Sequence, residues 1–128
     1  MRSLGQKGHV MEKGTVYVTD HAYGRIKERM GLSNRAAARM AELAYEDGIT
    51  YSETSGKLYQ YIEGKTQSHL KPGINIKIYG EVVYCFLREK VNKKEKIFLL
   101  TAWNIPNDLK KSVLSVKKKR WVNRYVSH

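Results

Sequence analysis

The residue types best suited to chemistry gather between Thr19 and Leu32. This stretch reads T-D-H-A-Y-G-R-I-K-E-R-M-G-L. On a helix that turns about 100° per residue, one edge of it carries polar groups and the adjacent arc is apolar. The polar residues of that edge are His21, Arg25, Glu28 and Arg29. Such a helix can pack on a core while it holds a proton-transfer group beside two guanidinium groups.

This polar edge combines the abilities that a metal-free ribonuclease needs. Histidine can move a proton near neutral pH, and arginine can hold a phosphate and stabilise the charge of a phosphoryl transition state. A ribonuclease needs a base for the 2′-hydroxyl, an acid for the leaving 5′-oxygen and cations on the phosphate. The simpler interpretation is an ordinary helix surface, on which Arg25 and Glu28 form an ion pair worth little. Spacing alone favours the simpler interpretation.

A second group of candidate residues lies near the C-terminus, where a helix is expected over Asp108–Val126. Seven basic residues against Asp108 place half of the net charge of +12 in this segment. Spread cations bind a phosphate backbone, and aromatic rings among them can stack on exposed bases. The candidate nucleic-acid-binding residues are Lys110, Lys111, Lys117, Lys118, Lys119, Arg120, Trp121 and Arg124. The alternative is a solvated helix face with Trp121 on the core. The concentrated charge favours nucleic acid, although basic tails also bind acidic proteins.

Length and composition limit the class of protein. A chain of 128 residues, 41% of them hydrophobic, is long enough for one domain with a core. The net charge of +12 attracts polyanions, so RNA or DNA is the expected partner. The single cysteine, Cys85, excludes an internal disulfide and indicates a buried thiol in a reducing compartment. No segment resembles a membrane span or a signal peptide, so we expect a cytoplasmic protein with no membrane partner.

Other catalytic patterns are not found in the sequence. The histidines and acidic residues are scattered without metal-ligand spacing, and no phosphate-binding loop occurs, so we expect no metal and no cofactor. His9 and His128 lie in an expected arm and at the terminus. His69 lies in an expected loop, where it could complete an acid–base pair, although a solvent-exposed loop histidine is commoner.

The elements that must position these residues are two helices followed by hairpins. Met1–Gly14 is expected to be a flexible basic arm, and Thr15–Val18 a short edge strand. Asp20, or else Thr19, should cap the first helix, and Gly31 should end it. Ser33 then caps a second helix over Asn34–Asp47.

From Ile49 onward the pattern changes to that of strands. Strands are expected at Ile49–Ser52, Leu58–Ile62, Ile74–Tyr79, Val82–Leu87 and, most central, Ile97–Trp103, with a loop over Gly64–Gly73. Turn residues between these segments predict hairpins, and hairpins make an antiparallel sheet. The predicted fold class is α+β. Two N-terminal helices pack on a four- to five-stranded antiparallel sheet, with a basic C-terminal helix or tail.

One longer pattern resembles a known family. H-A-x-x-R-I-K-E-R-x-G-L after a short strand, a second helix, and hairpins that close on L-L-T-x-x-x-x-P resemble small phage and mobile-element proteins of the RelE-like superfamily. This is the barnase–EndoU–colicin–RelE fold of metal-independent endoribonucleases and toxins. The resemblance implies a domain over residues 15–106, between the arm of residues 1–14 and a basic tail of residues 107–128. It also implies an active cleft on the open side of the sheet. By residue match, the catalytic set is His21, Arg25, Arg29 and Thr101.

Two functions follow as expectations. The first is an RNA-binding protein of the RelE-like toxin type, with metal-independent endoribonuclease activity in which His21 moves the proton. The second is a non-catalytic phage-encoded inhibitor that binds a host nucleic acid or nucleoprotein, for example an anti-CRISPR or other anti-defence protein. An acidic protein, either an antitoxin or a host nucleoprotein, is the expected protein partner. The His21→Ala variant separates the two functions.

Overall fold

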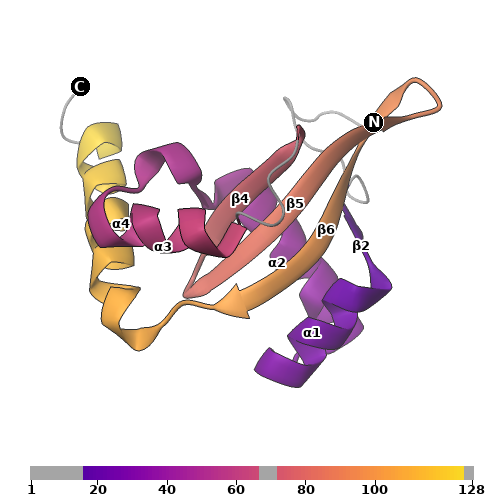
Figure 1. Ribbon diagram of the computed structural model, residues 1–128, viewed down its shortest axis with the longest axis horizontal. Coiled ribbons are helices and arrows are strands. Elements are labelled where there is room, and N and C mark those ends of the chain that lie inside the picture. Colours follow the sequence, from indigo (N-terminus) through magenta and orange to yellow (C-terminus); the bar gives the residue numbers. More distant parts are fainter. Residues whose placement is uncertain (1–15, 67–71, 126–128) are drawn as a thin grey trace.

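A five-stranded sheet with helices on both faces forms the described part of the protein (Figure 1). The computed structural model describes residues 16–66 and 72–125. In chain order, the elements are β2 (Val16–Val18), α1 (Asp20–Met30), α2 (Asn34–Asp47), β3 (Ile49–Thr50), the 3-10 helix η1 (Tyr51–Glu53), α3 (Gly56–Thr66), β4 (Ile74–Tyr79), β5 (Val82–Val91), β6 (Lys94–Asn104), the 3-10 helix η3 (Asn107–Leu109) and α4 (Lys110–Tyr125). The predicted arm Met1–Gly14 and His9, His69 and His128 lie outside these ranges.

The order of the strands across the sheet is β2-β6-β5-β4-β3. All neighbouring pairs are antiparallel except β2 and β6, which are parallel. The predicted α+β class is therefore confirmed, with two helices before the hairpins and a helix after them. The strand expected to be most central, β6, lies inside the sheet, but β5 occupies its middle. In the ranges that the structure describes, no helix combines the length and apolarity needed to cross a bilayer.

The two N-terminal helices begin and end at the predicted residues. The Thr19 hydroxyl accepts a hydrogen bond from the Ala22 amide at 3.1 Å, and the Ser33 hydroxyl accepts one from the Ala36 amide at 3.2 Å. These caps satisfy amides that have no partner inside the helix. Gly31 ends α1 with φ of 69°, a left-handed conformation that suits a residue without Cβ.

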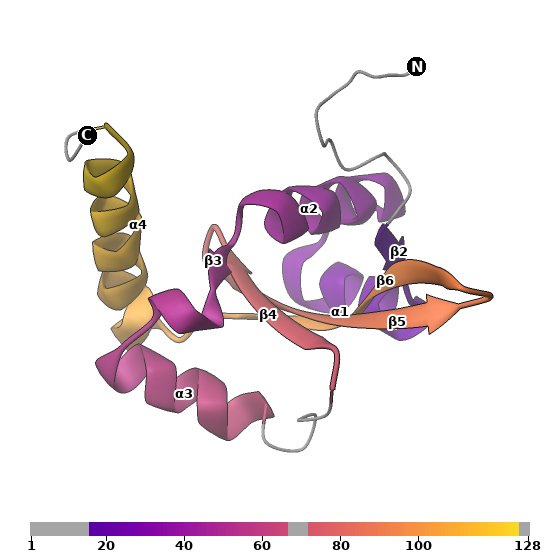
Figure 2. The same ribbon diagram turned by 90° about the horizontal axis from the view of Figure 1, so that it is seen from above.

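Each face of the sheet has its own apolar core. On one face, α1 and α2 contribute Ala22, Ile26 and Ala41 to a cluster with Phe86 and Leu99 of the sheet. The members of the other cluster include Leu58, Ile62, Ile76, Val83, Cys85, Val113 and Val116, contributed by α3, α4 and the sheet. Figure 2, which views the sheet near its edge, shows α2 above the sheet, α3 below it and α4 at one end. The sheet face opposite α1 and α2, which the resemblance leaves open, carries this second core.

The predicted strand Leu58–Ile62 is wrong, because these residues lie in α3. Leu58 and Ile62 are four residues apart and are 1% and 0% exposed, so one side of a helix buries both. The tyrosines between them favoured a strand by propensity, but packing on the sheet decided the outcome. Two neighbouring expectations change with it. The strand predicted at Ile49–Ser52 ends at Thr50, and α3 continues to Thr66, so Gly64–Thr66 belong to a helix and not to the predicted loop.

One extra residue in β6 changes which side chains face each core. Phe86 pairs with Leu99, whereas Cys85 pairs with Thr101, so Leu100 has no partner of its own and forms a β-bulge. Residues directly opposite each other in an antiparallel pair point to the same face. Thr101 therefore lies on the same face as Cys85, with α3 and α4.

Candidate nucleic-acid interface

Helix α4 has a buried side and a strongly basic side. Leu109, just before it, is 6% exposed, and Val113 and Val116 are 1% and 8% exposed. The exposed lysines of the helix are Lys111, Lys117, Lys118 and Lys119. The helix contains no Asp or Glu from Lys110 to Tyr125. The basic C-terminal segment is therefore a helix that packs into the second core at one end of the sheet and displays its lysines from there.

Arg120 fastens this helix to the rest of the protein. Its Nη1 donates to the Asp47 carbonyl at 2.6 Å, and its Nη2 donates to the Gly48 carbonyl at 2.9 Å. Its Nε and Nη2 also donate to the two carboxylate oxygens of Glu53, at 3.0 and 2.7 Å. These bonds satisfy carbonyls at the end of α2, where a helix leaves acceptors without partners. Arg120 was predicted to bind nucleic acid, but its hydrogen bonds are directed inward.

Glu53 is held by donors from both sides of this junction. The Thr50 amide donates to its Oε1 at 2.9 Å, in addition to the bonds from Arg120. Partial burial alone would raise the pKa of Glu53, but the hydrogen bonds from Arg120 and Thr50 outweigh it and lower the pKa. Lys77 lies near the same pair, and burial together with the charge of Arg120 lowers the pKa of its ammonium.

The other predicted nucleic-acid residues differ in their surroundings. The Lys110 ammonium lies 3.2 Å from the Glu81 carboxylate, so a surface ion pair compensates part of its charge. Trp121 keeps 57% of its surface exposed. The side chain of Arg124 lies outside the described part of the structure. The lysines Lys117, Lys118 and Lys119 are therefore the concentrated positive charge of the interface.

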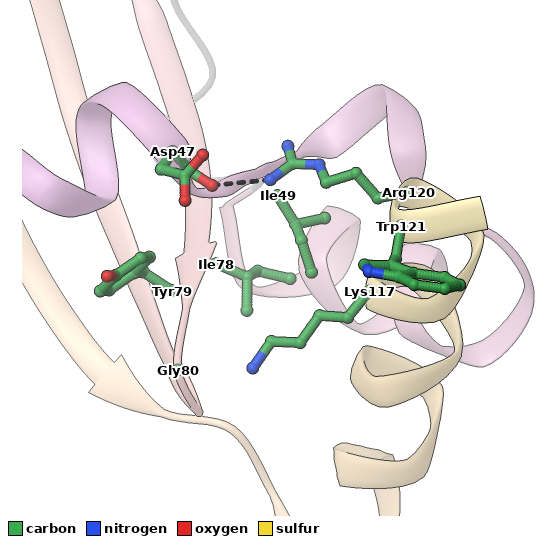
Figure 3. Close-up of a pocket in the computed structure, with 8 residues that line it drawn as sticks. All are labelled: Asp47, Ile49, Ile78, Tyr79, Gly80, Lys117, Arg120 and Trp121. Atoms are coloured by element: carbon green, nitrogen blue, oxygen red, sulfur yellow. Dashed lines mark hydrogen bonds between the residues drawn. The ribbon is translucent and has the colours of Figure 1, made fainter. Parts of the chain in front are cut away.

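A hollow lies next to these lysines, between α4 and the end of β4 (Figure 3). Its volume is about 490 Å³. The residues that line it are Asp47, Ile49, Ile78, Tyr79, Gly80, Lys117, Arg120 and Trp121. Lys117 and Trp121 thus belong both to the basic helix and to a concave surface.

The polar edge of α1 forms ordinary surface contacts. Arg25 Nη1 lies 3.1 Å from Glu28 Oε1, and their side chains are 41% and 67% exposed. Arg29 Nη1 donates to the Ala102 carbonyl of β6 at 2.9 Å and so ties α1 to the sheet. His21 is exposed on the first turn. The ion pair expected from spacing between Arg25 and Glu28 is confirmed.

The structure does not bring the four predicted catalytic residues together. His21, Arg25 and Arg29 lie on α1, which packs on one face of the sheet. Thr101 lies on the opposite face, because it pairs with Cys85 in the register shifted by the bulge. In addition, Figures 1 and 2 show α1 and α4 at separate parts of the molecule, so the basic helix does not extend the polar edge of α1.

Sequence reasoning missed most of the hollow. Asp47 and Ile49 were noted only as the end of a helix and the start of a strand, and Ile78 and Tyr79 only as parts of a strand. No spacing along the chain links these positions to Trp121. The one available signal was the turn at Gly80, which is the end of β4 that α4 approaches.

No protein-family model, no curated protein and no solved structure matches this chain. The RelE-like resemblance and the activity it implies therefore stay predictions. Within residues 16–66 and 72–125, no group of three or more His, Cys, Asp or Glu side chains is placed to hold a metal ion.

Proposed function

We propose that this protein binds RNA through the basic face of α4, without cleaving it. The observation that carries this proposal is the display of Lys117, Lys118 and Lys119 on a helix whose opposite side is buried and whose position Arg120 fixes. Because the backbone of this helix is already held in place, binding a phosphate backbone does not have to order it. Trp121 beside them offers a ring for stacking, which favours a single strand over a duplex.

A second lysine-rich surface lies at the β5–β6 hairpin, and comparison with it supports α4 as the RNA-binding surface. Lys90, Lys93 and Lys94 are exposed there. Glu89 and Glu95 alternate with them, and Glu95 accepts a hydrogen bond from Arg88 at 3.0 Å. Mixed charge of this kind attracts a polyanion less than the uninterrupted lysines of α4 do. Figure 1 shows this hairpin at the opposite end of the molecule from α4.

Neutralising the two surfaces in turn tests this proposal. We expect Lys117→Gln, Lys118→Gln and Lys119→Gln, combined in one variant, to weaken binding of a labelled single-stranded RNA and to reduce its salt dependence. The slope of log affinity against log salt should fall by about 2, because each phosphate contact on a single strand contributes about 0.7. Fluorescence anisotropy over a series of salt concentrations measures both quantities.

The matched control carries Lys90→Gln, Lys93→Gln and Lys94→Gln, which removes the same charge from the hairpin. We expect this control to keep most of the wild-type slope. An equal loss in both variants would mean that net charge alone attracts RNA, and the assignment to α4 would then fail.

The catalytic alternative needs its own test, at His21. We expect His21→Ala to bind RNA with the wild-type affinity, and RNA incubated with either protein to stay intact, because His21, Arg25 and Arg29 do not share a surface with Thr101. Gel analysis of RNA in the presence of a metal chelator measures this. Metal-free cleavage by the wild type that disappears in His21→Ala would establish the endoribonuclease instead.

A non-catalytic RNA-binding protein agrees with the second function expected from the sequence, an inhibitor directed at host nucleic acid or nucleoprotein. We place it in the cytoplasm, because the buried Cys85 is a structural thiol. Burial raises its pKa to about 11, which keeps the thiol protonated and unreactive. Capture of a host protein after nuclease treatment would point to a protein target rather than to RNA.

A further inference from the structure

The hollow beside α4 is larger than a site that contacts only a phosphate backbone needs to be. Its volume of about 490 Å³ lies between α4 and the end of β4, where Tyr79 leads into the turn at Gly80. Pockets that hold small organic groups span roughly 300–1,000 Å³. The hollow therefore has room for a flat ring together with the sugar and phosphate attached to it.

An aromatic ring, that of Trp121, forms one side of this hollow, and two isoleucines lie at its base. Figure 3 shows Trp121 of α4 on one side, with Ile49 and Ile78 next to it, whereas the Tyr79 ring points to the other side of β4, where it packs on the first core. The two isoleucines are 2% and 1% exposed, so they belong to the fixed core. Trp121 is 57% exposed, which leaves its ring accessible. The exposed face of Trp121 therefore favours a planar ring that can stack on it.

Charged groups of both signs stand at the rim. Lys117 extends from α4 toward Gly80, and Asp47 lies on the far side at the end of α2 (Figure 3). Arg120 lies near both, but its donors are already bound to Glu53 and to the carbonyls of α2. Among the described residues, no hydrogen bond or ion pair engages the Lys117 ammonium. The rim therefore offers one cation for an anion and one carboxylate for a hydrogen-bond donor.

We propose that this hollow takes one unstacked nucleobase that carries an amino group, with the adjoining phosphate at Lys117. This inference rests on the proposed RNA binding and states which chemical group of the RNA one part of that site recognises. The Asp47 carboxylate accepts a hydrogen bond from this amino group, as acidic side chains accept one from the amino group of cytosine. Its charge also repels a bare phosphate, so the hollow suits a base better than the backbone. Uracil has no amino group and fits the rim less well.

Tryptophan fluorescence can report the base directly. The chain has two tryptophans, and Trp103 is bound through its Nε1 to the Tyr61 hydroxyl at 3.0 Å, in another part of the core. In a Trp103→Phe background, emission comes from Trp121 alone, and circular dichroism checks that the fold is kept. We expect a short oligocytidylate to quench this emission in a saturable manner. The same length of oligouridylate should bind about tenfold more weakly.

Two variants separate stacking from base choice. Trp121→Ala, measured by anisotropy, should weaken oligocytidylate binding about tenfold, because a stacked ring contributes this much per base. Asp47→Asn should reduce the preference for cytidylate over uridylate while leaving the salt dependence unchanged. Tyr17→Leu is the matched aromatic control, since Tyr17 is 44% exposed but lies on β2, and it should change neither quantity.

The failure of this inference is distinguishable from the failure of RNA binding. Lysine-dependent binding without a change in Trp121 emission, or with full affinity in Trp121→Ala, would overturn the base site and leave the proposed function standing. Cytidine monophosphate that binds as tightly as the oligonucleotide would overturn the assignment to a strand and indicate a free nucleotide. If the wild-type protein bound no RNA even at low salt, both proposals would be overturned.

Discussion

At the scale of single residues, Arg120 shows how a sequence can mislead about a basic cluster. It lies in the run Lys117–Arg120, and its charge suggests the same role as that of the lysines. Arginine carries five donors in a fixed fork, which suits it to paired carbonyl and carboxylate acceptors. Here the fork binds Glu53 and the end of α2. The lysines of the run, with flexible stems and compact charges, stay on the surface.

Glu53 gives the stability of the protein a predictable dependence on pH. Its folded-state pKa lies below the ordinary value of 4.5, so its contribution is complete above that value and is lost as the pH falls through the lower, folded pKa. We expect Glu53→Gln to lower the free energy of unfolding by about 1 kcal/mol at neutral pH, and the difference from wild type to shrink in acid. Urea unfolding on both sides of pH 4.5 measures this. Glu46→Gln, at an exposed position on α2, removes the same charge and is the matched control. A difference that grows in acid would contradict the assignment.

At the scale of elements, two glycines of similar appearance in the sequence have opposite roles. Gly48 ends α2 where β4 passes close to it, and a Cβ there would meet the Ala44 carbonyl and lie 2.9 Å from the Lys77 Cβ. Gly24 lies inside α1 with nothing within 4 Å of a Cβ. The first glycine therefore permits a close approach of two backbones, while the second only weakens its helix.

Replacing each glycine by alanine tests this difference. We expect Gly48→Ala to destabilise the protein by about 2 kcal/mol, because the backbone of β4 must move away. Gly24→Ala should stabilise it by about 0.8 kcal/mol, since alanine is the better helix former. Thermal and urea unfolding measure both changes. The same sign of effect for the two substitutions would show that the contact at Gly48 has no energetic importance.

At the scale of the whole molecule, the C-terminal segment is a part of the fold. The resemblance implied a domain that ends at residue 106, followed by a basic helix or tail over residues 107–128. This segment is the helix α4, which contributes Val113 and Val116 to the same core as α3 and β5. Helices on both faces give the sheet two separate cores. The proposed RNA interface on α4 therefore depends on the stability of the second core.

Paired substitutions on the two sides of α4 test this dependence. Val113 is 1% exposed and Leu114 is 53% exposed. We expect Val113→Ala to lower the free energy of unfolding by about 2 kcal/mol, through lost burial and a small cavity. Leu114→Ala should change it by less than about 0.5 kcal/mol. Equal and small effects, measured by urea unfolding, would show that α4 is a loosely attached tail.

The sequence by itself determined the features that depend on neighbours along the chain. The caps Thr19 and Ser33, the left-handed Gly31, the strand Ile74–Tyr79 and the ion pair between Arg25 and Glu28 were all predictable, because each needs residues only a few positions apart. The α+β class followed from their order.

Only the tertiary structure decided what lies together in space. Leu58–Ile62 became a helix because packing on the sheet outweighed local propensity. The β-bulge at Leu100 fixed which face of the sheet Thr101 occupies, and so separated it from His21. The packing of α4 joined Trp121 to Asp47 and Tyr79, residues that share no pattern in the chain. A surface site is assembled from distant segments, and their meeting depends on the cores beneath it rather than on spacing in the sequence.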